Sequence, residues 1–327
     1  MQVITGDLLK NKKVLLRADI DVPIENGKVI EDFRLKAGLP TLKLCLESAA
    51  QVIVMGHIGR PEGKVIDELR VGPVERWLRE QDNLRSYLES GKIKLLENLR
   101  FDPREESEDL EYAKELAQMG QIYINEAFAA YRRAVSTTVL PKLLPHAAGL
   151  RFAEEVRVIR AVRDKPKKPF VAIMGGAKVE DKLRVIKVLA QKADAVLVGG
   201  KLVHEIREQN IQLPSNVLVG KLEEGGFDIS PDTTDSWKDL IMRAKMIVWN
   251  GPLGKFEDPR YIQTEKVAEM VINSGAEVVI GGGDSIAALN QYGLLEKAQQ
   301  VGFVSVGGGA LLKLLSEGTL ATIEALK

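Results

Sequence analysis

The segment PFVAIMGGAKVEDK, residues 169–182, decides the fold class of this chain. Its apolar run FVAIM predicts a buried strand, the glycine pair at 175–176 predicts a turn, and the amphipathic pattern that follows predicts a helix. The same order returns in LVGGKL (197–202), VIGGGDS (279–285) and SVGGGA (305–310). Strands that alternate with helices predict parallel sheets covered by helices, and near-continuous apolar runs are typical of strands buried on both faces.

This alternation extends outward from the segment over the whole chain. We predict strands at residues 14–20, 51–57, 93–96, 122–125, 170–174, 195–198, 246–250, 277–280 and 303–306. We predict helices at residues 39–50, 109–118, 152–162, 185–192, 264–274 and 310–316. The expected fold class is therefore α/β, with doubly wound parallel sheets of the Rossmann-like type.

The chain length and a local change of composition predict two domains. At about 150 residues per domain, a chain of 327 residues corresponds to roughly two domains. The helical stretch at 152–162 leads into RDKPKKP (163–169), a charged segment with two prolines that is typical of a linker. We therefore expect an N-terminal domain at 1–150, a helix and linker at 151–167, and a second domain from residue 168.

The composition argues against several classes of protein. Lysine and arginine together number 46, as do aspartate and glutamate, so the formal net charge is zero and a nucleic-acid-binding protein is not expected. The apolar fraction of 45% and the short charge runs exclude global disorder. The start MQVITGDLLKNKK lacks a signal-peptide pattern, and no apolar run reaches the length of about 18 residues that a membrane span needs, so we expect a cytoplasmic protein.

The single cysteine, Cys45, allows no intramolecular disulfide. It lies in LKLCLESAA (42–50), an amphipathic helical pattern. We expect a small buried side chain there, and a reactive thiol is the less favoured alternative.

The glycine junctions predict a phosphate site in the second half of the chain. In open α/β sheets, ligands bind beyond the carboxyl ends of the strands, where glycine turns and helix N-termini present N–H groups to phosphates. For any one junction a tight turn is the favoured interpretation, but four in one half favour a nucleotide site. None of them matches GxxxxGK[ST] or GxGxxG, so a P-loop fold and a dinucleotide-binding fold are both disfavoured.

Two of the glycine junctions also carry charged side chains. Lys178 and Lys182 are four residues apart, so they would share one face of a helix that starts near Lys178. Their mutual repulsion would be relieved by a bound anion, although a solvated surface is an equal alternative. Asp284 and Ser285 start another helix, where either can be an N-cap; in the functional interpretation, Asp284 holds Mg²⁺ on a nucleotide.

Basic residues recur near strand ends in the first half of the chain, where guanidinium groups can bind phosphate and carboxylate. They are Arg17, Arg34, Arg60, Arg100, Arg132 and Arg133. Asp19 and Asp21 lie among them, and His57 opens a turn after a predicted strand, where it is either structural or functional. A pocket for a small polyanion in one half and a phosphate site in the other suggest phosphoryl transfer.

In these motifs, and from end to end, the chain resembles the phosphoglycerate kinase family. The matching segments are VLLRADIDVP (14–23), EDFRLKAGLPTL (31–42), VIVMGHIGRPEG (52–63), KLLENLRFDPREE (94–106), YINEAF (123–128), KPFVAIMGGAKVEDK (168–182), VWNGPLGKFED (248–258), IGGGDSIAAL (280–289) and VSVGGGALLKLL (304–315).

The resemblance implies reversible phosphoryl transfer between 1,3-bisphosphoglycerate and ADP, which gives 3-phosphoglycerate and Mg-ATP in glycolysis or gluconeogenesis. It implies two doubly wound domains joined by a hinge helix, with in-line transfer in a cleft that hinge motion closes. The nucleotide domain would span 168–310, and a C-terminal segment at about 311–327 would pack back on the 3-phosphoglycerate domain. The implied ligands are these substrates and Mg²⁺; a monomer is expected, without nucleic acid or membrane partners.

The resemblance also implies residue roles by position. Arg34 resembles the arginine that stabilises the transferring group, Glu257 the acceptor of the ribose hydroxyl, and Asp284 the ligand of the Mg-nucleotide. The implied catalytic residues are Arg34, Lys178, Gly307, Gly308 and Gly309. The implied acid-binding residues are Asp19, Ile20, Asp21, Arg34, His57, Ile58, Gly59, Arg60, Arg100 and Arg133. The implied nucleotide-binding residues are Gly176, Lys178, Lys182, Gly200, Asn250, Pro252, Glu257, Gly282, Gly283, Asp284 and Ser285.

The chain departs from the family pattern at several positions. Asp21 stands where the family has Asn, and an ionised carboxylate there would repel an anionic acid unless an arginine compensates. In AAYRRAV (129–135), Arg132 and Val135 replace two histidines, and Arg132 is our candidate for the missing positive charge. Glu126 replaces Asp and Val306 replaces Thr.

The chain is also shorter than typical members of the family, with losses expected between residues 63 and 92 and between 201 and 246. The departures leave two alternatives open: a nucleotide-binding relative without activity, and a kinase for a different small carboxylate. The active enzyme is favoured by the retention of Arg34, Lys178, Lys182, Glu257 and Asp284.

Overall fold

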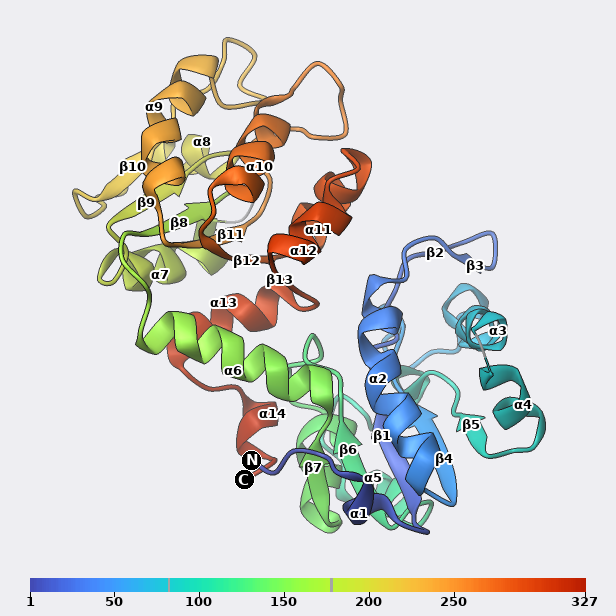
Figure 1. Ribbon diagram of the computed structural model, residues 1–327. Helices are drawn as coiled ribbons and strands as arrows, with labels where there is room; N and C mark the ends of the chain where they lie inside the picture. The colour runs from blue at the N-terminus through green and yellow to red at the C-terminus, as the bar shows by residue number, and fades with distance from the viewer. Residues whose placement is uncertain (82, 177–178) are drawn as a thin grey trace. The chain divides into compact units, whose positions relative to one another are not determined.

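The computed structural model describes residues 1–81, 83–176 and 179–327, and these divide into two compact units. Unit 1 comprises Met1–Val156 with Thr319–Lys327, and unit 2 comprises Arg157–Gly318. The chain passes from one unit to the other within helix α6 (Leu150–Asp164). Both chain ends belong to unit 1 (Figure 1). The segment that returns to unit 1 is thus the last nine residues, a shorter stretch than the expected 311–327.

Unit 1 contains a five-stranded parallel sheet in the order β5–β4–β1–β6–β7. Its strands are β1 (Lys13–Arg17), β4 (Gln51–Met55), β5 (Ile93–Leu95), β6 (Ile122–Asn125) and β7 (His146–Ala148). A separate antiparallel hairpin consists of β2 (Ile24–Glu25) and β3 (Lys28–Val29). The direction of strand addition reverses between β1 and β6, and ligands bind in α/β sheets at the carboxyl ends of such a pair.

The helices of unit 1 flank this sheet (Figure 1). The α-helices that lie wholly in unit 1 are α1 (Gly6–Leu9), α2 (Phe33–Ser48), α3 (Gly72–Glu80), α4 (Leu84–Glu89), α5 (Leu110–Ala117) and α14 (Ala321–Glu324). Short 3₁₀ turns occur at η1 (Asp67–Leu69), η2 (Leu99–Phe101) and η4 (Leu140–Leu143), and a π-helical turn at η3 (Val135–Val139). Helix α2 begins six residues before the predicted start, because it continues through Pro40, which normally interrupts a helix.

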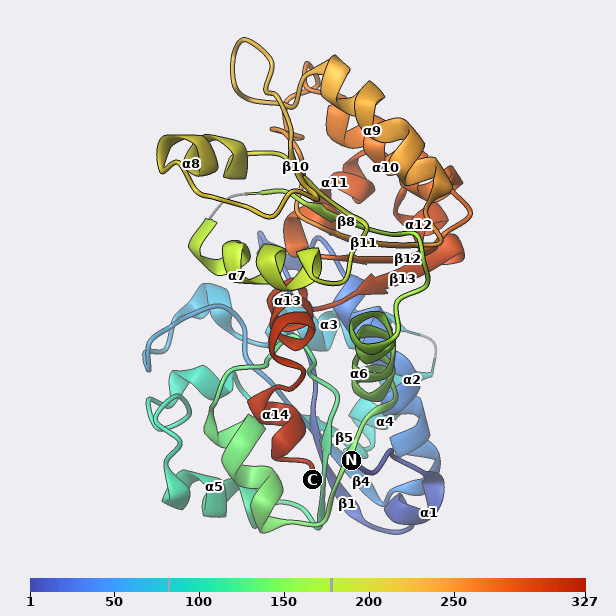
Figure 2. The ribbon, with the colours of Figure 1, turned by 90° about the vertical axis from the view of Figure 1, so that its left-hand side faces the viewer.

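Unit 2 contains a six-stranded parallel sheet in the order β10–β9–β8–β11–β12–β13. Its strands are β8 (Phe170–Met174), β9 (Ala195–Val198), β10 (Val217–Val219), β11 (Met246–Asn250), β12 (Glu277–Gly281) and β13 (Gly302–Ser305). Its helices are α7 (Val179–Ala190), α8 (Leu202–Glu208), α9 (Pro231–Arg243), α10 (Gln263–Asn273), α11 (Gly283–Gln291), α12 (Leu295–Val301) and α13 (Gly308–Glu317). Helices α9 and α10 pack on one face of the sheet and α7 and α13 on the other (Figure 2). The strand order reverses between β8 and β11.

The α/β class with parallel sheets is confirmed, and several predicted boundaries are wrong by a few residues. Strand β1 ends at Arg17 instead of residue 20, and β4 ends at Met55 instead of residue 57. Asp19 and His57 therefore lie beyond the carboxyl ends of their strands. Strands β7 (HAA) and β10 (VLV) were not predicted from the sequence, since each has only three residues.

Cys45 is fully buried in α2, as predicted, and burial raises the pKa of its thiol to about 12. In the part of the chain that the structure describes, no helix has the length and apolar character needed to cross a membrane.

Candidate functional site

The first candidate site lies in unit 1, at the carboxyl ends of β1, β4 and β6. A pocket of about 460 Å³ opens there, and we call it the basic pocket. Five arginines line it: Arg17, Arg60, Arg100, Arg132 and Arg133. His57 also lines it, and its acidic lining consists of Asp21, Glu105 and Glu106. Five of the six arginines that the sequence places near strand ends thus meet at one pocket, which is suited to a small polyanion.

Arg17 is the best-anchored cation of the basic pocket. Only 1% of the residue is exposed, and its guanidinium donates to Ala18 O (2.6 Å), to Ser136 Oγ (2.9 Å) and to His57 Nδ1 (2.6 Å). The Ser136 hydroxyl in turn donates to Glu105 Oε1 (2.5 Å), and Glu105 is also buried. Neither Ser136 nor Glu105 was assigned to the site from the sequence.

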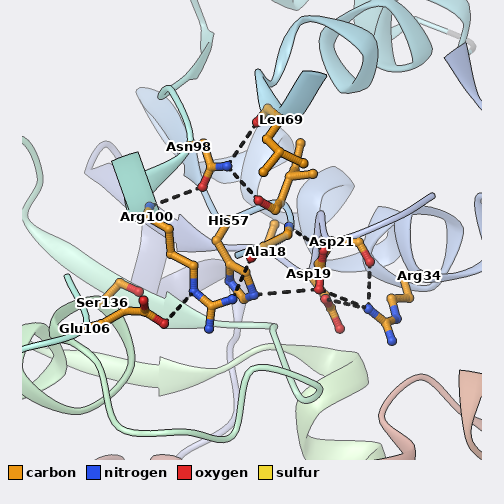
Figure 3. Close-up of polar contacts among 12 residues, drawn as sticks. Ala18, Asp19, Asp21, Arg34, His57, Leu69, Asn98, Arg100, Glu106 and Ser136 are labelled. Atoms are coloured by element: carbon orange, nitrogen blue, oxygen red, sulfur yellow. Dashed lines mark hydrogen bonds and ion pairs between the residues drawn. The ribbon is translucent and has the colours of Figure 1, made fainter. Parts of the chain in front are cut away.

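Asp21 is held by neighbouring donors at the rim of the basic pocket (Figure 3). The Gly59 N–H donates to Asp21 Oδ1 (2.9 Å), and Arg34 Nη1 and His57 Nε2 each lie 3.8 Å from Asp21 Oδ2. Arg34 Nη1 also donates to the Asp21 carbonyl (2.6 Å). Arg34 therefore offsets the charge of the Asp21 carboxylate only in part, because 3.8 Å is longer than a hydrogen bond and the Asp21 side chain is 38% exposed.

Asp19 lies deeper than Asp21, with 8% of the residue exposed. Burial raises the pKa of its carboxyl group, although the guanidinium of Arg34, 4.0 Å away, opposes this shift. Its Oδ2 atom is buried without a hydrogen-bond partner among the described residues. An uncommitted buried oxygen next to a basic pocket can accept a hydrogen bond from a ligand hydroxyl.

The remaining cations of the basic pocket are more exposed. Arg100 donates to Gly59 O (2.7 Å) and pairs with Glu106 at 3.2 Å. Arg133 is 65% exposed and donates to Glu108 Oε2 at 2.8 Å. Arg60 and Arg132 are also exposed, so these side chains can turn toward a ligand at little cost.

The second candidate site lies in unit 2, where β8 and β11 end. A pocket of about 850 Å³ there includes five of the predicted nucleotide-site residues: Gly176, Gly200, Pro252, Glu257 and Asp284. We call it the glycine pocket. Its lining also includes Lys201, His204 and Phe227, which were not assigned to the site from the sequence. Lys201 lies within the junction LVGGKL, whereas His204 and Phe227 lie in no recognisable motif. Phe227 is 53% exposed and lies against Tyr261, with 5.6 Å between the ring centroids.

The glycines of this pocket allow three strand-end loops to approach one another closely. Gly176 N–H donates to Pro252 O (2.6 Å), and Gly200 has a φ of +67°. A Cβ at Gly200 would lie 2.9 Å from both Gly176 N and Pro252 O. Only glycine fits this position, because the backbone conformation and the available space both exclude a side chain.

Two helix N-termini converge beside this pocket. Gly282 precedes α11, Gly308 begins α13, and a Cβ at Gly308 would lie 2.4 Å from Gly282 Cα. Neither helix has a side-chain cap, so its first N–H groups remain available. Two positive helix ends at one place favour a phosphate or a transferring phosphoryl group.

Comparison with known proteins identifies the family of this chain. The family model for phosphoglycerate kinase matches residues 6–213 and 207–318. The chain belongs to the phosphoglycerate kinase family. The phosphoglycerate kinase of Herpetosiphon aurantiacus is 37% identical over 99% of this chain and 98% of its own, and that of Thermomicrobium roseum is 35% identical over 97% of both.

Solved phosphoglycerate kinases have the same fold. The structure from Coxiella burnetii has a TM-score of 0.80 at 29% identity, and that from Pyrococcus horikoshii OT3 has a TM-score of 0.82 at 27% identity. Each comparison covers 97% of this chain and 96% of the other. The chain is accordingly a phosphotransferase with a carboxyl group as acceptor, and ATP binding follows from that activity.

The chain is a compact member of the family. Its alignment with the Herpetosiphon aurantiacus kinase runs over 391 positions, whereas the chain has 327 residues, so the relative carries residues without a counterpart here. The two matched segments of the family model overlap at 207–213, which covers the end of α8 and part of the loop that leads to β10. An interrupted match at this point agrees with the predicted loss between residues 201 and 246.

Four of the residues that the family resemblance implied have buried side chains. The side chains of Ile20 and Ile58 are buried in the hydrophobic core of unit 1, so only their backbone can face a substrate. Ser285 is fully buried; its hydroxyl donates to Gly281 O (3.1 Å) and accepts from Gly251 N–H (2.7 Å). The Asn250 amide donates to Gly281 O (2.8 Å) and is also buried. The Ser285 and Asn250 side chains thus hydrogen-bond to the backbone at the strand ends beside the glycine pocket.

The remaining charged residues of the expected nucleotide site are Lys178, Lys182 and Asp284. Lys182 Nζ donates to Gly175 O, beside the glycine pocket. Lys178 lies outside the described residues. Asp284 is exposed in the first turn of α11 and lines the pocket. The described residues contain no group of three His, Cys, Asp or Glu side chains that could hold a metal by themselves. One carboxylate beside a phosphate site fits Mg²⁺, which keeps water and phosphate oxygens as its other ligands.

Two other departures from the family pattern are buried. Glu126 accepts from Arg151 N–H (3.1 Å) and Phe152 N–H (3.2 Å), and it thus satisfies the first turn of α6. Burial nevertheless raises the pKa of its carboxyl group to about 8. Val306 is 2% exposed, directly before the N-terminus of α13.

Proposed function

We propose that the basic pocket binds 3-phosphoglycerate or 1,3-bisphosphoglycerate and that the glycine pocket binds Mg-ADP or Mg-ATP. The observation that carries this proposal is that the two units line their pockets with different kinds of residues. Unit 1 gathers five arginines and His57 around about 460 Å³, whereas unit 2 presents glycine loops and two helix N-termini beside about 850 Å³. The smaller, cationic space fits a three-carbon acid with phosphate, and the larger one fits a nucleotide.

In the basic pocket, the arginines would neutralise the phosphate and carboxylate of the acid. Asp19 Oδ2 would accept a hydrogen bond from the substrate hydroxyl, since this buried oxygen is uncommitted. Arg34 would serve two roles. It offsets part of the Asp21 charge, and it would stabilise the equatorial oxygens of the transferring group.

In the glycine pocket, Gly176, Gly200 and Pro252 would border the nucleotide, Glu257 would accept from a ribose hydroxyl, and Asp284 would hold Mg²⁺. A bound Mg²⁺ neutralises phosphate charge and orients the transferring group. The first N–H groups of α11 and the N–H groups of Gly308 and Gly309 would bind the phosphoryl oxygens, and Gly307, whose N–H donates to Ser305 Oγ (3.3 Å), would hold this loop in place. Lys178 and Lys182 would contribute positive charge.

In the direction of ATP formation, the reaction needs no general base, because the attacking oxygen belongs to an anionic phosphate of ADP. Catalysis then consists of in-line positioning and stabilisation of charge. Transfer requires contact between the two substrates, so we propose hinge motion that closes the site and excludes water.

The test is a coupled assay with purified protein, ATP, Mg²⁺ and 3-phosphoglycerate, in which an added dehydrogenase reports 1,3-bisphosphoglycerate. We expect saturable turnover in both substrates and a strict requirement for a divalent cation. Measurable Mg-ADP binding without turnover would instead indicate a nucleotide-binding relative without activity. Turnover only with another small carboxylate would reassign the acid substrate.

We further propose that the protein acts as a cytoplasmic monomer. Within the described residues, the basic pocket is lined by unit 1 alone and the glycine pocket by unit 2 alone, so neither lining needs a second chain. Light scattering coupled to size-exclusion chromatography should give a mass near 36.0 kDa. Twice that mass would contradict the proposal.

A further inference from the structure

His57 lies at the edge of the basic pocket with each ring nitrogen in a different environment. Its Nδ1 atom is 2.6 Å from Arg17 Nη2, and its Nε2 atom is 3.8 Å from Asp21 Oδ2. Figure 3 shows His57 between Arg100 on one side and Asp19 and Asp21 on the other. Which nitrogen carries the proton determines whether the ring offers a donor or an acceptor to a ligand.

The contact with Arg17 fixes this choice. A guanidinium group has only donors and stays protonated in proteins, so Arg17 Nη2 must donate and His57 Nδ1 must accept. An Nδ1 atom that accepts carries no proton. A neutral ring must then carry its proton on Nε2, the nitrogen on the Asp21 side.

The Arg17 guanidinium is itself held by a chain of hydrogen bonds in which each group donates to the next. Arg17 Nε donates to Ser136 Oγ, and the Ser136 hydroxyl donates to Glu105 Oε1. Glu105 Oε2 also accepts from Ser136 N–H (3.1 Å), and Arg17 Nη1 donates to Ala18 O (2.6 Å). All three nitrogens of Arg17 are thus committed, so the group facing His57 cannot rotate without breaking buried hydrogen bonds.

We propose that Arg17 is a positioning residue that keeps His57 neutral, with its proton on Nε2, so that the ring offers one N–H donor to an oxygen of the bound acid. This assignment rests on the proposed function only for the identity of that acid. Burial, with the guanidinium groups of Arg17, Arg100 and Arg34, holds the pKa of His57 well below its ordinary value, which agrees with a neutral ring.

The experiment uses long-range ¹H–¹⁵N NMR on the full chain, without substrates and near neutral pH. The sequence has three histidines, His57, His146 and His204, so His57→Gln assigns the signal of interest. We expect a pyridine-type ¹⁵N shift for His57 Nδ1 and a pyrrole-type shift for Nε2. The reverse pattern, or an imidazolium, would overturn the proposal.

Two variants test whether Arg17 sets the tautomer. Ser136→Ala removes the acceptor of Arg17 Nε, so we expect a mixture of tautomers and a rise of roughly two- to tenfold in KM for 3-phosphoglycerate, with kcat retained. Tyr123→Phe is the matched control. Its buried hydroxyl donates to the backbone carbonyl of Ser136 (2.7 Å) but does not contact Arg17, so the tautomer and KM should stay unchanged.

If Ser136→Ala and Tyr123→Phe change the tautomer and KM equally, Arg17 has only a structural role and the proposal is refuted. If Ser136→Ala does not fold, Arg17→Lys replaces it, because an ammonium cannot reach the three acceptors together. The substrate-free spectrum also separates this inference from the proposed function. A chain without kinase turnover that still shows the Nε2–H tautomer would refute the function and support the role of Arg17.

Discussion

Asp21→Asn is expected to improve binding of 3-phosphoglycerate. The side chain lies at the rim of the basic pocket, with 38% of it exposed. Asparagine keeps an oxygen that can accept from Gly59 N–H, as Asp21 Oδ1 does at 2.9 Å, so the loop that carries Gly59 should hold its position. The substitution therefore removes one negative charge and leaves the local hydrogen bond intact.

The size of the effect follows from Coulomb's law. An anionic substrate group about 5 Å from a half-exposed carboxylate is repelled by roughly 1 kcal/mol when the effective dielectric constant is close to that of water. Removal of this repulsion lowers KM for 3-phosphoglycerate about fivefold. The difference should shrink as salt is added, since screening acts on exposed charges.

The assay is the coupled assay at low and at high ionic strength, with Mg-ATP saturating. Asp67→Asn is the matched control, because it removes the same charge from an exposed carboxylate outside the basic pocket, paired with Arg70. It should leave KM unchanged. A raised KM in Asp21→Asn would refute the reasoning and would mean that the carboxylate itself contacts the substrate.

The other predictions concern transfer, the metal and stability. Arg34→Ala should lower turnover roughly a thousandfold or more, as loss of a transition-state arginine does, while calorimetry finds Mg-ADP affinity within a few-fold; unchanged turnover would remove Arg34 from the transfer role. Asp284→Asn should weaken Mg-ADP roughly tenfold or more and leave KM for 3-phosphoglycerate unchanged. The free energy of unfolding should fall as pH rises from about 4.5 to about 8, because folded Glu126 keeps its proton to about pH 8 and the unfolded chain does not. Urea unfolding of Glu126→Gln across this range should show a flatter dependence, and an equally steep one would contradict the assignment.

The sequence predicts the inner strands of unit 2 well, but it does not predict one edge strand of each sheet, β7 and β10. FVAIM in β8 and MIVWN in β11 are buried throughout, so their continuous apolar pattern marks the strand ends correctly. The edge strands β7 and β10 have three residues each, and their pairing depends on neighbours far away in sequence. The early start of α2 was missed because Pro40 is a strong local signal against a helix, yet tertiary packing overrides it.

The candidate site divides in the same way. Strand-end arginines and glycine junctions are local signals, and the structure gathers most of them around two pockets. The contacts that hold these side chains in place are not local. Arg17 and Ser136 are hydrogen-bonded although they are 119 positions apart in the sequence, and Ser136 and Glu105 are 31 positions apart. No local motif could therefore predict this buried network. Ile20 and Ser285 sit inside the right motifs, but their side chains point into the protein.

The three histidines allow the most direct test of the two-pocket assignment. His57 lines the basic pocket, His204 lines the glycine pocket, and His146 lies in β7 with its Nδ1 atom 2.6 Å from Pro141 O. In a histidine NMR titration, 3-phosphoglycerate should shift the His57 signals and Mg-ADP the His204 signals, while His146 stays unchanged. A shift of the same histidine by both ligands, or no shift of His57 by saturating 3-phosphoglycerate, would contradict the account.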